Sequence, residues 1–192
     1  MRRRVAAVAS LPDGLDDAEL VAALALPTRS EDAYWLLMSR GASAVPAVRD
    51  GLRSADGLVR YQCCRVLDHY LTEDVLPELV AMLEDDHPRV VCQVLHSLIC
   101  ERCKEGECRP DAEVVFRGAR RLLLESPVPI VRSLAAEVVG ADVHFRAEAL
   151  TALERVRDTD VSAMVRKKAG WYLPGGPIFA RTAPKPRRPA VH

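Results

Sequence analysis

The chain has 192 residues, 49% of them hydrophobic, with 27 basic and 27 acidic side chains. This length suffices for one ordinary domain or for roughly four to five helical-pair repeats. No segment approaches the roughly 18–20 consecutive apolar residues of a membrane-spanning helix. Residues 174–192 carry four of the basic side chains and no acidic one, so the rest of the chain is net acidic, which argues against a dedicated duplex-DNA binder, whose fold usually carries a basic face. We therefore expect a cytoplasmic protein without a membrane partner, in which the six cysteines are thiols or metal ligands.

Helix-type periodicity dominates the chain, and the alternating pattern of β-strands is nearly absent. Pro, Gly and short polar residues separate the helical segments. In chain order, a first helix is expected at 16–26, and a helix at 30–38 is paired with one at 43–52. The later helices are expected as pairs, namely 58–71 with 74–83, 88–100 with 112–124, and 130–139 with 145–156, followed by a last helix at 161–173.

A short pattern opens four of these helices. It reads Val59-Arg60, Val90-Val91, Val131-Arg132 and Val165-Arg166, with spacings of 31, 41 and 34 residues. A small or compact residue stands four positions after each first Val, and a Leu or Val stands eight positions after it. A period in this range, carried by helices, predicts helical hairpins that stack on one another.

The pattern resembles the short HEAT-like repeats of the phycobilisome lyases, in which Asp is followed by Val-Arg, Ala and Leu-Gly. The matching residues are Asp56 with Val59-Arg60, and Ser126 with Val131-Arg132, Ala135 and Gly140. The resemblance implies an all-α fold, an alpha-alpha superhelix (HEAT-like solenoid) with a Cys-rich loop insertion. It leaves the activity open, because the same scaffold hosts lyases, glycosylases, hydroxylases and passive adaptors.

Three parts are expected on this basis. Residues 1–29 form an N-terminal cap region, and residues 30–173 form the HEAT-like repeat array. Residues 174–192 form a Gly/Pro-rich basic tail that is largely extended or disordered. Either Trp171 and Tyr172 close the array and Ile178-Phe179 folds back onto it, or this strip leads into an extended binding peptide. The repeat arginines, Arg60, Arg132 and Arg166, have two interpretations: an anion-binding ladder, or side chains that pair with an Asp to stabilise neighbouring turns.

The spacing of 41 residues contains an insertion between Cys100 and Asp111. Together with His96 it reads His-x3-Cys-x2-Cys-x4-Cys, which supplies four candidate zinc ligands: His96, Cys100, Cys103 and Cys108. On one continuous helix His96 and Cys103 would lie about 10 Å apart along the axis, so the helix must end near Cys100 for both to bind one ion. Such an ion would be structural, holding an insertion too short to bury its own core.

Other interpretations of the cysteines stay open. The three thiols of the insertion can be buried apolar groups, or a redox pair can form from Cys103 with Cys100 or Cys108. Cys63, Cys64 or His69, on the preceding repeat helix, can replace His96 as the fourth ligand. Cys63, Cys64 and Cys92 are otherwise expected to be packing residues.

No nucleotide-binding glycine loop, His-Glu-x-x-His or Gly-x-Ser-x-Gly motif occurs in the sequence, so no catalytic or cofactor-binding residue is predicted. We expect a non-enzymatic scaffold or adaptor that binds a protein partner, with a tentative zinc ion. One alternative is a nucleic-acid-associated protein that uses the basic tail residues Arg181, Lys185, Arg187 and Arg188. Another is a lyase or enzyme accessory factor with reactive cysteines.

Overall fold

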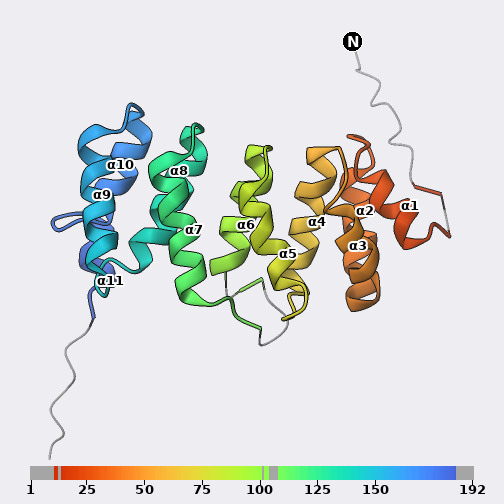
Figure 1. Cartoon of the computed structure of the whole chain (residues 1–192). Coiled ribbons are helices and arrows are strands. Elements are labelled where there is room, and N and C mark those ends of the chain that lie inside the picture. Colours follow the sequence, from red (N-terminus) through yellow and green to blue (C-terminus); the bar gives the residue numbers. More distant parts are fainter. Residues whose placement is uncertain (1–10, 13, 101, 104–107, 185–192) are drawn as a thin grey trace, which may run out of the picture. The chain divides into compact units, whose positions relative to one another are not determined.

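In the computed structural model, residues 11–12, 14–100, 102–103 and 108–184 are described. Their regular secondary structure is entirely helical (Figure 1), as the fold class predicts. The chain divides into two compact units, Met1–Pro110 and Asp111–His192. No helix in these described ranges is both long and apolar enough to span a bilayer.

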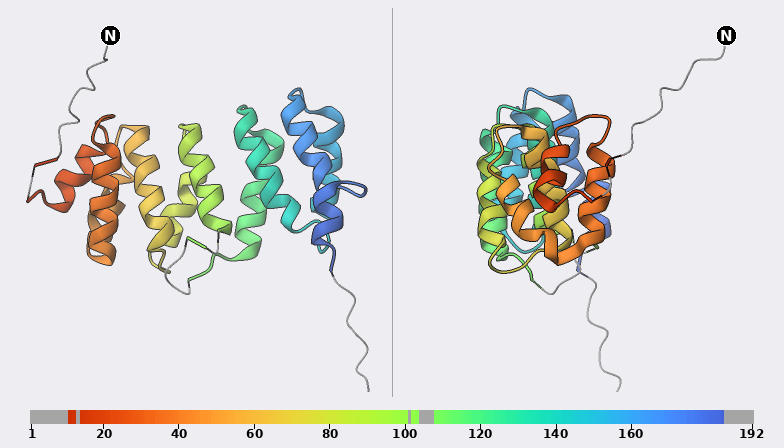
Figure 2. Two further views of the ribbon diagram at one scale, coloured as in Figure 1. Left: turned by 180° about the vertical axis from the view of Figure 1, so that it is seen from behind. Right: turned by 90° about the vertical axis from the view of Figure 1, so that its right-hand side faces the viewer.

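The first unit consists of short helices joined by tight turns. They are α1 (Asp17–Ala23), α2 (Ser30–Arg40), α3 (Val45–Gly51), α4 (Gly57–His69), α5 (Leu76–Ala81) and α6 (Pro88–Ile99), with 3-10 turns η1 (Gly41–Ala44) and η2 (Met82–Glu84). A capping box opens α1, because Asp16 accepts the Glu19 amide and Glu19 accepts the Asp16 amide. Helices α4 and α6 pack side by side, as Figure 2 also shows.

The second unit is built in the same way. They are α7 (Ala112–Glu125), α8 (Pro129–Ala141), α9 (Ala147–Thr159), α10 (Ala163–Trp171) and α11 (Pro177–Thr182). Asp111 caps α7 by accepting the amides of Glu113 and Val114. Helix α8 packs against α7, α9 and α10, and eight of its 13 residues are buried, which makes it the core of this unit.

The pairing of helices differs from the sequence prediction. Each Val-type helix packs more extensively on the helix before it than on the helix after it, so the close hairpins within the units are α3–α4, α7–α8 and α9–α10. The connections inside two of these hairpins are only residues 126–128 and 160–162. Three-residue turns of this kind hold antiparallel helices together.

The turn before each Val-type helix has one repeated geometry. The side chain five positions before the Val accepts a hydrogen bond from the backbone N–H of the residue two positions after its own. This bond satisfies a donor that has no partner within the helix. The four acceptor–donor pairs are Ser54–Asp56, Asp85–His87, Ser126–Val128 and Asp160–Ser162.

The repeat arginines bind these turns. Arg60 donates to both carboxylate oxygens of Asp85 at 2.7 and 2.8 Å and to the Ser54 carbonyl at 2.9 Å. Arg132 donates to both carboxylate oxygens of Asp160 at 2.7 and 2.9 Å and, in the same way, to the carbonyl of its own turn. The turn-stabilising interpretation is confirmed for these two residues. Arg166 binds its turn through the carbonyls of Asp160 and Val161.

The start of the predicted tail is helical and folds back onto the second unit. Residues Pro177–Thr182 form α11, a short helix within the segment that the sequence predicts to be largely extended. The His144 ring lies 4.4 Å from that of Phe179, and its Nε2 lies 3.1 Å from both the Phe179 carbonyl and the Thr182 hydroxyl. These contacts anchor α11 to the turn between α8 and α9.

Gly140 provides a test of this packing. A Cβ added at Gly140 would overlap the ring of Tyr172, whereas one added at Gly170 would meet no neighbouring atom. We expect Gly140→Ala to lower the free energy of unfolding by about 1–3 kcal/mol, because the ring must shift. The matched change Gly170→Ala should raise it by up to about 1 kcal/mol, since Ala favours a helix. Urea unfolding measures both, and a stabilised Gly140→Ala variant would contradict the described contact.

Candidate metal centre and partner-binding pocket

Helix α6 ends where the metal hypothesis requires. Its last residue is Ile99, and Cys100 has extended backbone angles, φ −81° and ψ 106°. The chain then turns back, so that the sulfur of Cys103 lies 3.1 Å from that of Cys100 and 3.5 Å from Nε2 of His96. The break in the helix therefore brings together residues that one continuous helix would separate.

Three of the four predicted ligands share one place. The donor atoms of His96, Cys100 and Cys103 all lie within 4.8 Å of one another. Cys108, which the structure also describes, does not belong to this group. The alternatives Cys63 and Cys64 are fully buried. Burial raises the pKa of Cys63 to about 12, as expected of a packing residue rather than a metal ligand.

Asp68 is a fourth polar group at this place, and the sequence analysis missed it. Its carboxylate Oδ2 lies 3.5 Å from Nε2 of His96, and its side chain is only 3% exposed. It comes from the last turn of α4, whereas the other three residues follow one another at the end of α6. Asp68 directly precedes His69, which the sequence analysis considered as a ligand, but no role was assigned to Asp68 itself.

The electrostatics of the group favour a cation. A hydrogen bond with Cys100, burial and the nearby Asp68 carboxylate together raise the pKa of Cys103 to about 12. A thiolate there is unfavourable because another thiol and a carboxylate surround it, and a divalent ion would reverse this balance. Sulfur and imidazole donors are those that zinc prefers.

The separations match a tetrahedral ion in part. With Zn–S of about 2.3 Å and Zn–N of about 2.0–2.1 Å, donors of one tetrahedral zinc lie about 3.6 Å apart for S and N and about 3.8 Å for two sulfurs. The 3.5 Å between His96 and Cys103 agrees with this value. The 3.1 Å between the two sulfurs is a thiol hydrogen bond that zinc binding would widen.

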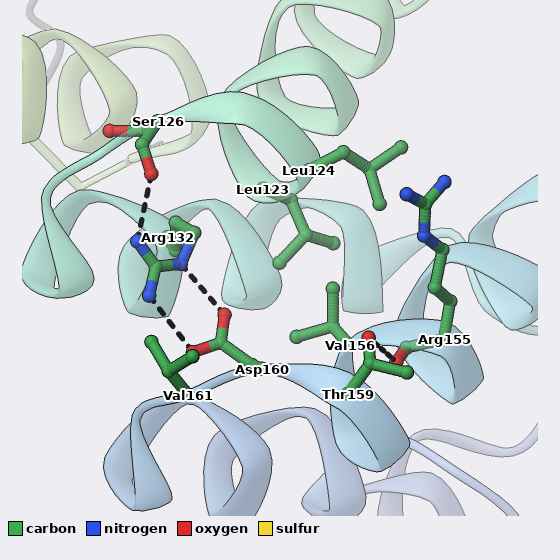
Figure 3. A pocket seen from close by; sticks show the side chains of 9 residues that line it. All are labelled: Leu123, Leu124, Ser126, Arg132, Arg155, Val156, Thr159, Asp160 and Val161. Carbon is green, nitrogen blue, oxygen red and sulfur yellow. Dashed lines mark hydrogen bonds and ion pairs between the residues drawn. The ribbon is translucent and has the colours of Figure 1, made fainter.

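A second feature lies in the Asp111–His192 unit, between the α7–α8 and α9–α10 turns. It is a cavity of about 240 Å³ (Figure 3), lined by Leu123, Leu124, Ser126, Arg132, Arg155, Val156, Thr159, Asp160 and Val161. Arg132 and Asp160 form its floor as a bidentate pair and are occupied by each other. The Arg132–Asp160 pair therefore forms part of the cavity wall, and a ligand would be recognised by the other side chains that line the cavity.

Arg155 gives the cavity a charged group. Figure 3 shows its side chain extended, with the guanidinium turned away from the Arg132–Asp160 pair. No acidic side chain in the described part of the second unit forms an ion pair with it. Exposed apolar side chains lie at the adjoining turns and helix starts, with Val161 90% exposed, Ile130 48% and Met164 46%. The surface thus combines one positive charge with apolar area.

The comparison with protein families decides the class of the chain. HEAT repeats match residues 16–99 and 45–140, which together cover more than half of the sequence. The chain belongs to the HEAT-repeat family. No curated protein matches it, and the match does not specify the phycobilisome-lyase type of repeat.

As a HEAT-repeat protein, the chain has the predicted all-α, HEAT-like solenoid class, in which neighbouring helices pack as stacked hairpins within each unit. HEAT repeats generally serve as scaffolds for protein–protein interaction. Of the basic tail residues considered for nucleic-acid binding, Arg181 lies in α11. Lys185, Arg187 and Arg188 lie outside the described residues.

Proposed function

We propose that this HEAT-repeat protein is a non-enzymatic cytoplasmic scaffold that binds a protein partner at the cavity of its second unit. The observation that carries the proposal is the guanidinium of Arg155, which pairs with no acidic side chain in the described part of the second unit, in a cavity that the exposed Val161 also lines. An interface residue that combines charge with planar apolar surface is commonly Arg, and such residues carry much of the binding energy.

The chemistry of the cavity selects the partner. Its floor is already neutralised by the Arg132–Asp160 pair, so a bound chain meets one net positive charge, that of Arg155. The partner segment therefore carries an acidic side chain for Arg155, next to an apolar side chain that covers Val161. Ordinary electrostatic complementarity of this kind sets the orientation and specificity of an interface.

Site-specific photo-crosslinking tests the proposal. Val161→p-benzoylphenylalanine should yield an adduct with one protein in host extract, unaffected by nuclease. Arg155→Glu should reduce that adduct roughly tenfold, the effect of about 1.4 kcal/mol of lost binding energy. Arg120→Glu, an equal change of charge at an exposed residue of α7 outside the cavity, should leave it unchanged.

A second crosslinking position supplies the positional control. Phe145 is also apolar and 74% exposed, but it precedes α9 whereas Val161 follows it. The two positions are separated by the length of that helix, about 20 Å at about 1.5 Å per residue. Equal adducts from both positions, or an adduct insensitive to Arg155→Glu, would contradict binding at the cavity. An adduct that nuclease removes would favour the nucleic-acid alternative.

We also propose that a structural zinc ion binds at the end of α6, with His96, Cys100 and Cys103 as ligands and with Cys108 as the fourth ligand that the sequence suggests. The ion would supply the cation that the cluster lacks and hold the segment after α6 against its own repeat. The agreement of the His96–Cys103 separation with zinc geometry supports this site. Elemental analysis of protein purified without added metal should find about one equivalent.

A further inference from the structure

We propose that Cys100 and Cys103 are a site of reversible oxidation, at which a peroxide converts the two thiolates of the metal centre into a disulfide and releases the ion. This inference rests on the proposed zinc site and adds a reaction to it. The substrate class is a small two-electron oxidant. The same two residues then either hold a metal or form a bond with each other.

The first argument is the position of the two sulfurs. They lie 3.1 Å apart, and a disulfide bond is about 2.0 Å long, so the sulfurs need to approach by only about 1 Å. Both residues follow Ile99, the last residue of α6, and Cys103 lies in a bend of the chain. The approach therefore moves a segment outside the regular helix.

The second argument is access. Cys100 and Cys103 are both half-buried, so a molecule as small as hydrogen peroxide can reach them. Cys63 and Cys64 are 0% exposed, and buried structural thiols of this kind are inert. Cys92 is half-buried as well but does not belong to the metal group, which makes it an internal control.

The third argument is the charge of the sulfurs in the loaded centre. A thiolate, and not a thiol, attacks an oxidant. The hydrogen bond with Cys100, together with burial, raises the pKa of Cys103 and makes a thiolate unfavourable without an ion. A bound divalent ion holds both sulfurs as thiolates. The loaded centre therefore supplies the nucleophile.

The reaction balances with hydrogen peroxide as the oxidant. One thiolate attacks a peroxide oxygen, the O–O bond breaks, and a sulfenic acid and a hydroxide ion form. The second thiolate attacks the sulfenic sulfur, forms the S–S bond and displaces a second hydroxide ion. The two sulfurs lose two electrons, which the peroxide gains. Two electrons and two protons from a dithiol reductant restore both thiols.

The disulfide releases the ion because it consumes two ligands at once. Its sulfurs no longer carry the negative charge with which thiolates bind zinc. Of the four candidate ligands only His96 and Cys108 then remain, and two ligands do not make a closed zinc site. Since the disulfide joins residues only three positions apart, it does not replace the link that the ion makes to His96. Oxidation should therefore lower the unfolding temperature of the first unit, as chelation does.

Peptide mapping tests the disulfide. Zinc-loaded, full-length protein is treated with hydrogen peroxide, the remaining thiols are alkylated, and the chain is cut with trypsin, which places Cys100, Cys103 and Cys108 on three separate peptides. We expect the peptide of Cys100 to be joined to that of Cys103, and the link to disappear after treatment with dithiothreitol. Cys92 shares the peptide of Cys100, so Cys92→Ser should give the same product. A link between Cys103 and Cys108, or no link, would overturn the proposed pair.

A chromophoric chelator measures the release of the ion in the same reaction, with an untreated sample as the reference. About one zinc ion should leave for each disulfide formed, since both sulfur ligands are lost together. A disulfide that forms while the zinc stays bound would overturn the release. Protein that holds no zinc before treatment would overturn the metal site and this inference with it. Zinc-loaded protein that forms no disulfide would overturn this inference alone.

Discussion

We expect Asp160→Ala to lower the free energy of unfolding of the second unit by about 3 kcal/mol. The Arg132 and Asp160 side chains are only 10% and 6% exposed, and two hydrogen bonds join them. Removing one partner of a buried pair leaves the other charge uncompensated, which typically costs about 3–5 kcal/mol. We take the lower end because the adjoining cavity lets water approach the guanidinium, and because Arg132 keeps its bond to the Ser126 carbonyl.

Asp158→Ala is the matched control, since it removes a carboxylate two residues earlier in the same turn region. Asp158 pairs with its neighbour Arg157, but their side chains are 59% and 45% exposed. Water and salt screen such a pair, so the variant should unfold almost as the wild type does. Urea unfolding followed by hydrogen exchange of α8 and α10 measures both effects. Equal destabilisation by the two changes would contradict a buried pair.

The same pair predicts a dependence on pH. The hydrogen bonds from Arg132 lower the pKa of Asp160 below its ordinary value. A lowered pKa in the folded state gives stability that is complete above the unfolded pKa of about 3.9 and is lost as the pH falls through the folded value. The difference between wild type and Asp160→Ala should therefore be constant from about pH 7 to 5 and shrink below about pH 4.

Removal of zinc should have the largest effect on the first unit. An ion that binds only the folded state stabilises it by about 4 kcal/mol when its free concentration is about 1,000 times the Kd. Because the proposed ligands lie at the end of α6, which packs on α4, chelation should deprotect these two helices in hydrogen exchange. Helices α8 and α10, in the other unit, should keep their protection.

Thermal unfolding with and without chelator, under reducing conditions, supplies the second measurement. We expect the first unit to unfold at a lower temperature after chelation and to recover when zinc returns. The control is Cys92→Ser, which removes a half-buried thiol of α6 outside the metal group and should preserve the response to zinc. Identical exchange of α4 and α6 in both states would rule out a structural ion at this position.

The sequence predicted the helices well because their signals are local. Asp and Ser before the Val-type helices mark turns, and Pro88 and Pro129 mark helix starts, where a missing amide costs little. The pairing of helices was predicted less well, because periodicity shows which face is buried and not which neighbour covers it. The short turns at 126–128 and 160–162 decide that question.

The cluster of His96, Cys100 and Cys103 shows the same difference between local signals, which the sequence gives directly, and tertiary contacts, which it does not. His96, Cys100 and Cys103 are close in sequence, so their spacing suffices to predict that they meet. Asp68 reaches them only because α4 packs along α6, and no local pattern records that contact. The spacing of residues along the sequence does not predict a contact between segments that are far apart in the chain.

The arginine pattern shows what the sequence does encode over long range. Arg60 is followed by Asp85 in the next turn, and Arg132 by Asp160, and each of these pairs forms. The corresponding residues between these two pairs are Val91 and Ser126, which cannot form an ion pair. Both the Arg and the Asp are therefore replaced at this repeat, and the boundary between the two units falls between Val91 and Ser126 in the sequence.

The most direct test of this account is a crystal structure of the zinc-loaded protein, with anomalous diffraction recorded on both sides of the zinc absorption edge. We predict one anomalous peak in the first unit, bonded to the His96 imidazole and to the sulfurs of Cys100 and Cys103. No peak at this position would contradict the metal centre itself.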